Sequence, residues 1–66
     1  MVIVFNGKEA EIAGGMNVLE LLESQDIAVD TVVVELNKSI VPSDVFGETQ
    51  LNDGDHLEVL RFVGGG

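Results

Sequence analysis

The sequence contains no cysteine, tryptophan or tyrosine, and its 66 residues include one proline, one histidine and three basic residues. Without cysteine, neither a disulfide nor a thiolate metal site can stabilise so short a chain. The basic residues Lys8, Lys38 and Arg61 are too few and too scattered for binding nucleic acid or an anionic membrane. No apolar run reaches the ~20 residues that span a bilayer, and no signal-peptide pattern is present. We therefore expect a soluble, cytoplasmic protein.

The residues that are present suit a small, acidic, single-domain protein. Hydrophobic residues make up 45% of the chain, and 12 acidic residues give a net charge of -9. A chain of this length buries only ~60% of the surface that its unfolded form exposes, so its core must be economical. The acidic balance favours docking onto a basic protein surface.

The first two apolar segments form a predicted hairpin. Met1–Phe5 is rich in β-forming residues, and Lys8–Ile12 alternates polar with apolar side chains. Asn6-Gly7 between them is a preferred pair for a type I′ turn, in which both central residues need positive φ. We expect Ala10 and Ile12 to face the core.

A helix is predicted to follow Gly14-Gly15. Asn17 is a suitable N-cap, and Glu20 stands three residues later, where a capping box places its second member. Met16 and Leu21 are spaced as a hydrophobic staple. Three apolar residues fall on one helical face and are expected in the core: Val18, Leu21 and Leu22.

The second half of the chain reads as further strands with irregular connections. The expected elements are a strand Thr31–Leu36, a turn at Asn37-Lys38, a strand Ser39–Val41, an irregular or single-turn segment Ser43–Gln50 anchored by Val45 and Phe46, a turn Leu51–Asp55 and a strand His56–Val63. The first and last strands are the most apolar, so we place them side by side and parallel in mid-sheet. The predicted fold is α+β: a β-grasp (ubiquitin-like) mixed sheet of four to five strands with one main helix on one face.

The sequence lacks the residue sets of an independent enzyme. His56 is the only histidine and is interpreted as a strand-edge residue. Asn52–Asp55 lacks the spaced ligands of a calcium loop, so a plain turn is expected there. Gly14-Gly15 lacks the following glycine and lysine of a phosphate loop. We expect no catalytic residue, no bound metal and no cofactor held by this chain.

The glycine tail is the exceptional feature. We divide the chain into a β-grasp domain at residues 1–63 and a flexible tail at residues 64–66. Gly64, Gly65 and Gly66 have no side chains and reach ~10 Å when extended. They can therefore enter a narrow channel in a partner enzyme and deliver the Gly66 carboxylate for activation. The alternative is a linker remnant or a frayed end.

The last strand carries a second signal for partner binding. Its alternation places Leu57 and Val59 in the core and points Leu60 and Phe62 outward. Two large apolar side chains beside a mobile tail suggest a docking patch. The alternatives are that a helix or loop covers them, or that a bulge shifts the register. Arg61 is a further docking candidate, pairing with an acidic residue of a partner or with a neighbouring Glu.

A set of short motifs is spread along almost the full length of the chain: Asn6-Gly7, the helical Val18–Leu22, Val34–Asn37 followed by Ile40–Pro42, Gly54-Asp55, and Val59–Gly66. In these motifs the chain resembles the ThiS family of sulfur-carrier proteins of thiamin biosynthesis. Family members often carry Arg after the Val-Pro pair and Trp or Tyr shortly beyond it. This chain departs from that pattern, with Ser43 and Phe46 at these places.

The resemblance implies a protein co-substrate rather than an enzyme. A ThiF-like adenylyltransferase would use ATP and magnesium to adenylate Gly66, and a sulfur donor protein would complete its conversion to a thiocarboxylate. That sulfur would pass to the thiazole synthase ThiG, with Gly64 and Gly65 entering the partner sites. Two alternatives stand beside this interpretation: a MoaD-like carrier for molybdopterin synthesis, and a ubiquitin-like interaction module with an unmodified tail.

Overall fold

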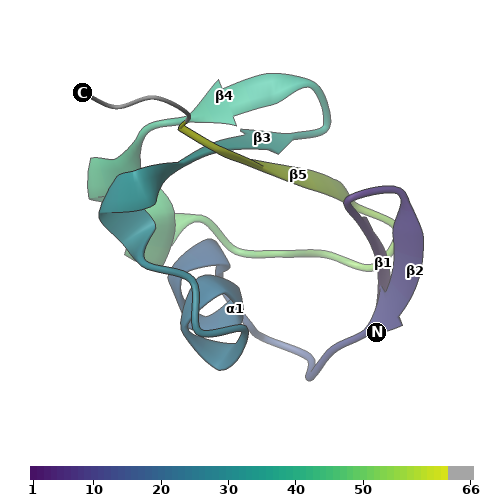
Figure 1. Cartoon of the computed structure of the whole chain (residues 1–66). Coiled ribbons are helices and arrows are strands. Elements are labelled where there is room, and N and C mark those ends of the chain that lie inside the picture. The colour runs from purple at the N-terminus through teal and green to yellow at the C-terminus, as the bar shows by residue number, and fades with distance from the viewer. Residues whose placement is uncertain (63–66) are drawn as a thin grey trace.

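Five strands and one α-helix form a two-layer structure, seen in a computed structural model that describes residues 1–62 (Figure 1). The elements are β1 (Val2–Phe5), β2 (Lys8–Glu11), α1 (Val18–Ser24), the 3₁₀-helix η1 (Val29–Thr31), β3 (Val32–Leu36), β4 (Ser39–Val41), the 3₁₀-helix η2 (Ser43–Glu48) and β5 (His56–Arg61). The strand order is β2-β1-β5-β3-β4. β1 and β5 are parallel neighbours, whereas the other pairs are antiparallel. The predicted α+β, β-grasp fold is confirmed.

The first hairpin forms as its turn residues predict. Asn6 and Gly7 both have positive φ, at 51° and 82°, and Phe5 pairs with Lys8 across the turn. The ladder continues past the end of β2, because the Ile12 amide donates to the Met1 carbonyl at 2.8 Å. Ala10 and Ile12 pack against the core, as expected.

The predicted capping box closes the start of α1. The Glu20 amide donates to Asn17 Oδ1 at 2.8 Å, and the Asn17 amide donates to Glu20 Oε1 at 2.9 Å. The start of α1 is also tied to the loop after η2, since the Val18 amide donates to the Thr49 carbonyl at 3.0 Å. These bonds hold a seven-residue helix that is too short to be stable alone.

Several predicted segments differ in detail, and β5 ends at Arg61 although the sequence predicts that the strand continues through Phe62. β3 begins at Val32 rather than Thr31, because the Thr31 amide and hydroxyl both donate to the Ala28 carbonyl and close the 3₁₀ turn η1. The segment after Pro42 is a 3₁₀-helix, and of its two expected anchors Phe46 is buried while Val45 is half-buried. The Asn37-Lys38 turn is confirmed and has positive φ at both residues.

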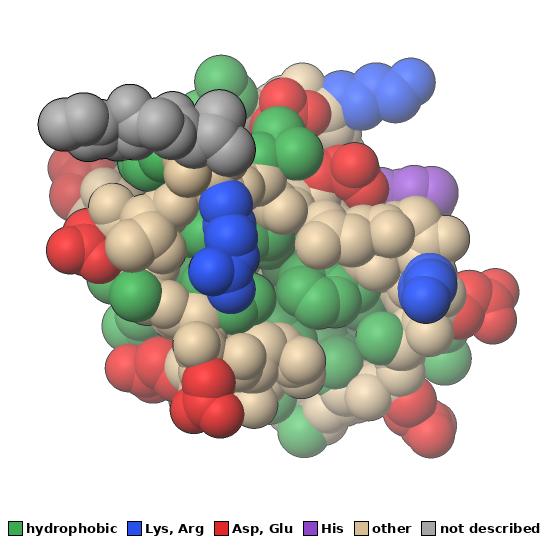
Figure 2. All heavy atoms as spheres, viewed as in Figure 1, with side chains coloured by type: hydrophobic (Ala, Val, Ile, Leu, Met, Phe, Trp, Pro, Cys, Tyr) green, Lys and Arg blue, Asp and Glu red, His purple; other side chains and the backbone are tan. Residues whose placement is uncertain are grey.

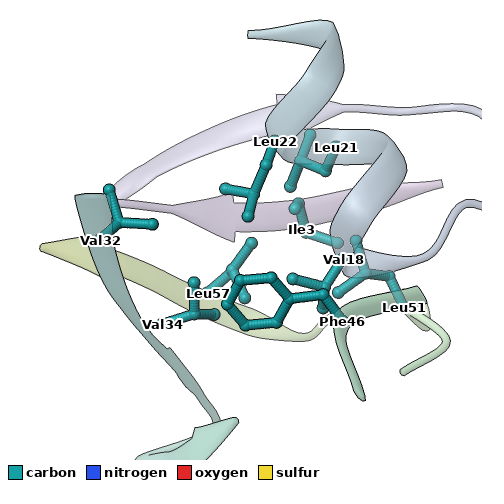
Figure 3. Close-up of a cluster of buried hydrophobic side chains, with 9 residues drawn as sticks. All are labelled: Ile3, Val18, Leu21, Leu22, Val32, Val34, Phe46, Leu51 and Leu57. Carbon is teal, nitrogen blue, oxygen red and sulfur yellow. The ribbon is translucent and has the colours of Figure 1, made fainter. Parts of the chain in front are cut away.

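The core lies between α1 and one face of the sheet (Figure 3). Its members are all apolar and come from every layer: Ile3, Val18, Leu21, Leu22, Val32, Val34, Phe46, Leu51 and Leu57. Within residues 1–62 no polar or charged side chain is buried. No helix in the described part of the chain is long and apolar enough to cross a membrane.

Candidate functional site

The candidate site is built on β5, the middle strand of the sheet. β5 pairs with β1 on one side and with β3 on the other, and its register with β3 runs without interruption from Leu57 to Arg61. No bulge shifts the pattern of alternating side chains along this strand. The predicted register of the last strand is therefore confirmed.

The two faces of β5 differ sharply. Leu57 is fully buried against the helix layer, and Val59 is half-buried on the same side. Leu60 and Phe62 project from the opposite face, where they are 52% and 60% exposed. Because α1 covers the other face, neither a helix nor a bulge removes these two side chains from solvent. Their predicted exposure is confirmed, while their role in docking stays a prediction.

Neighbouring strands extend the exposed apolar surface. Val33 is directly opposite Leu60 in the β3–β5 pair and is half-buried, and Ile40 on β4 is 67% exposed. We call Val33, Ile40, Leu60 and Phe62 the outer apolar patch. Ile40 was not singled out from the sequence. The signal for it was the turn at Asn37-Lys38, whose register aligns Ile40 with Glu35 on the outer face.

Arg61, the third predicted docking residue, does not belong to this patch. Alternation along β5 puts it on the side of Leu57 and Val59, at the end of the strand where it is exposed. The structure therefore brings Leu60 and Phe62 together on one face and Arg61 on the other. A partner would have to reach round the strand to contact all three.

A polar hollow adjoins the outer apolar patch at the start of β5. Its lining residues are Glu35, Asn37, Lys38, His56 and Glu58. His56 is the first residue of β5 and is exposed, and its backbone amide donates to Asn37 Oδ1 at 2.9 Å. This agrees with its interpretation as a residue at the end of a strand, next to a turn. Glu35 and Glu58 are directly opposite each other in the β3–β5 pair. The outer face thus has an apolar end near Phe62 and a charged end near His56.

The carboxylates before β5 serve the fold. Asp55 Oδ2 accepts from the Asn52 amide at 2.8 Å and Asp55 Oδ1 accepts from Asn37 Nδ2 at 3.0 Å, so this carboxylate closes the expected turn. Asp53 Oδ1 accepts from the Val2 amide at 2.8 Å. Residues 1–62 contain no group of three or more His, Asp and Glu side chains arranged to hold a metal ion.

Acidic side chains dominate the electrostatics of the surface. Figure 2 shows them at several separate points on the face in view, whereas the Lys and Arg side chains on that face are few and separated. With a net charge of -9, the molecule attracts a positively charged protein surface at long range. The exposed apolar side chains would then supply short-range contacts at the docked surface.

The predicted tail residues Gly64, Gly65 and Gly66 lie outside the described residues. The proposed boundary between a domain at residues 1–63 and a tail at residues 64–66 therefore stays a prediction. What the structure does describe is the strand that leads into them, from His56 to Arg61, and the exposed apolar side chains beside its end.

Comparison with known proteins points to one family. The ThiS family model matches residues 3–66. A solved structure of the thiamine biosynthesis protein ThiS from Geobacter metallireducens is 39% identical, covers all of both chains and superposes with a TM-score of 0.88. The sulfur carrier protein ThiS of Escherichia coli is 32% identical over 66 residues and is also covered in full.

One further relative is much longer than this chain. A thiazole synthase from Paramagnetospirillum magneticum is 39% identical over 66 residues, which are all of this chain but only 20% of that protein. The chain thus spans about one fifth of that relative and resembles one segment of it. Since the family model and the ThiS relatives match over nearly the whole sequence, the chain belongs to the ThiS family of sulfur carrier proteins.

Proposed function

We propose that this chain carries sulfur for thiazole formation in thiamin biosynthesis, as a thiocarboxylate on Gly66. The observation that carries the proposal is the pairing of a terminal glycine run with a preceding strand whose outward side chains, Leu60 and Phe62, are apolar and exposed. A partner that binds this strand holds the start of the tail in place. The cytoplasmic location expected from the sequence is part of the proposal.

The chemistry would take place in a partner, a ThiF-like adenylyltransferase that uses ATP and magnesium. A carboxylate oxygen of Gly66 attacks the α-phosphorus of ATP, and pyrophosphate leaves. A hydrosulfide ion supplied by a sulfur donor protein then attacks the Gly66 carbonyl carbon, AMP leaves with the oxygen that joined it, and the sulfur loses its proton. The product is a thiocarboxylate. These steps need positioning and charge stabilisation at the reacting atoms, which an activating partner supplies.

This chain would contribute recognition and reach. Its buried side chains within residues 1–62 are all apolar, so the described domain offers no sheltered acid, base or nucleophile. Gly64 and Gly65 would let the backbone enter a narrow channel, since glycine has no Cβ to obstruct it. The chain thus acts as a co-substrate that the enzymes recognise and modify.

The proposed acceptor of the sulfur is a ThiG-type thiazole synthase. The support is that a thiazole synthase of another organism contains a segment similar to all of this chain. A carrier-like segment within a thiazole synthase indicates that the two functions work together. Transfer of sulfur from a separate carrier chain to the synthase is the corresponding step proposed here.

Intact-mass spectrometry tests the proposal. The chain is incubated with a ThiF-like enzyme, ATP, magnesium and a sulfur source, and we expect the mass gain of one sulfur replacing one oxygen. The matched control is the chain shortened by Gly66, which should fold normally and gain no sulfur. No mass gain under conditions that modify a ThiS carrier from another organism would contradict the proposal.

A further inference from the structure

β5 extends beyond the strand that flanks it on one side. β1 pairs with β5 only through Val4 with His56 and Phe5 with Leu57. On the other side, β3 pairs with β5 as far as Arg61. Figure 1 shows β1 beside the first part of β5, while the second part continues along β3. The end of β5 is therefore flanked by a strand on one side only.

The hydrogen bonds show which backbone groups face the vacant side. The Phe62 amide donates to the Thr31 carbonyl at 3.1 Å, and the Asn37 amide donates to the His56 carbonyl at 2.8 Å. Even-numbered residues of β5 therefore bond to the β3 side, because bonding alternates along an antiparallel pair. The amides and carbonyls of Leu57, Val59 and Arg61 consequently point to the opposite side of β5, the side on which β1 pairs with the start of the strand.

Asn6 ends the pairing on the β1 side. Its amide donates to the Leu57 carbonyl at 2.9 Å, and its Oδ1 accepts from the Val59 amide at 2.7 Å. Three groups further along have no hydrogen-bond partner within residues 1–62, namely the Val59 carbonyl and the amide and carbonyl of Arg61. We call these three groups the open edge of β5.

We propose that thiazole synthase adds an extended segment to the open edge of β5. This inference rests on the proposed function, because it names how that partner recognises the strand that leads to the tail. Unpaired backbone groups at a sheet edge are a template for an added strand, with backbone bonds giving affinity and side chains giving specificity. The open edge lies next to the outer apolar patch and ends three residues before Gly64 in the sequence.

The geometry defines the added segment. In a parallel arrangement, a single partner residue opposite Leu60 donates to the Val59 carbonyl and accepts from the Arg61 amide. The side chain of that residue faces the same side as Leu60, so an apolar side chain fits there. The next residue lies opposite Arg61 on the other face, where an acidic side chain complements the guanidinium. Asn6 occupies the preceding position, so the segment starts at Val59 and runs towards Phe62.

A second copy of this chain is a poorer occupant of the same edge. Two copies would each bring a net charge of -9, which opposes their association. Thiazole synthase is favoured because one such enzyme contains a segment similar to this whole chain, which indicates a lasting spatial association of the two.

Arg61→Pro tests the backbone contact, and Arg61→Ala is its matched control. Proline removes the Arg61 amide hydrogen and places its ring on the vacant side, a position where a strand tolerates proline because the N–H is not used within the sheet. Alanine removes the same side chain but keeps the N–H. Binding of each variant and of the unsubstituted chain to thiazole synthase from the same organism is measured by calorimetry.

We expect Arg61→Pro to weaken binding at least about tenfold more than Arg61→Ala, the effect of one net hydrogen bond plus the steric block. Equal binding by the two variants would overturn the inference. A second measurement covers the case in which Arg61→Pro does not fold. The Arg61 amide of the unsubstituted chain should exchange at least about tenfold more slowly with deuterium in the complex than in the free chain.

An unprotected Arg61 amide in the complex would also overturn the inference. Protection that appears in the chain alone and grows with its concentration would identify a second copy as the occupant and would overturn it as well. The sulfur-for-oxygen mass gain of the unsubstituted chain reports on the proposed function separately. If the unsubstituted chain gains sulfur but both Arg61 variants bind thiazole synthase equally well, the edge contact is refuted and the proposed function is not.

Discussion

Replacing Leu60 and Phe62 together by serine should weaken partner recognition and leave the chain folded. The two side chains are 52% and 60% exposed, so about half of each remains to be buried by a partner. Full burial of such a side chain contributes ~1.5–3 kcal/mol, which gives about 1 kcal/mol for each and about 2 kcal/mol for both. At 1.4 kcal/mol per factor of ten, the apparent KM for this chain should rise about 30-fold.

The assay is sulfur loading by a ThiF-like enzyme, followed by intact mass at a series of chain concentrations. Thermal unfolding of the same variant reports on the fold, where the covered half of each side chain predicts a cost of about 1 kcal/mol, too little in sum to unfold a domain with a typical stability of about 5–15 kcal/mol. Val2→Ser is the matched control, because Val2 is 42% exposed but stands at the far end of β1. Since Val4 pairs with His56, Val2 is well removed from Leu60 along the sheet.

Two results would contradict this prediction. If the double variant unfolds in buffer, the two side chains contribute to the core despite their exposure. If it folds and is loaded with sulfur as efficiently as Val2→Ser, the outer apolar patch does not contact the activating enzyme.

Further substitutions test the supports of the strand and the tail. Asn6→Ala should lower the free energy of unfolding by about 2 kcal/mol, because alanine is strained at a positive φ and leaves the Val59 amide without its partner. Asn6→Asp should be close to the unsubstituted chain, because aspartate tolerates this φ and keeps the acceptor oxygen. Thermal melting compares the two variants, and equal melting temperatures would contradict this role of Asn6. Asn17→Ala should lower stability by about 1 kcal/mol through loss of the capping box, measured by urea unfolding, and an unchanged midpoint would contradict that role. Deleting Gly66 should leave the melting temperature unchanged and abolish sulfur loading; a loss of folding would show that the tail is structural.

Local sequence signals were sufficient for much of the fold. Asn6-Gly7 specifies a hairpin turn because few other pairs accept two positive φ angles, and both residues adopt them. Asn17 and Glu20 specify the start of α1 because their side chains bond to each other's amides. The alternation on β5 likewise predicted which side chains reach solvent.

Features that depend on distant residues were beyond sequence reasoning. Asn6 was predicted as a turn residue, yet its side chain also bonds the Val59 amide, 53 positions away. Nothing local signals such a contact. The open edge of β5 is of the same kind, because it follows from where β1 stops relative to β5 and from which residues bond to β3.

The decisive measurement is to identify the residue that carries sulfur. The chain is loaded by a ThiF-like enzyme with ATP and a sulfur source, and fragmentation mass spectrometry assigns the added mass to a residue. We expect one sulfur in place of one oxygen at Gly66, and this sulfur should disappear when thiazole synthase and its substrates are added. Sulfur at any other residue, or no exchange while a ThiS carrier from another organism is modified in the same mixture, would contradict this expectation.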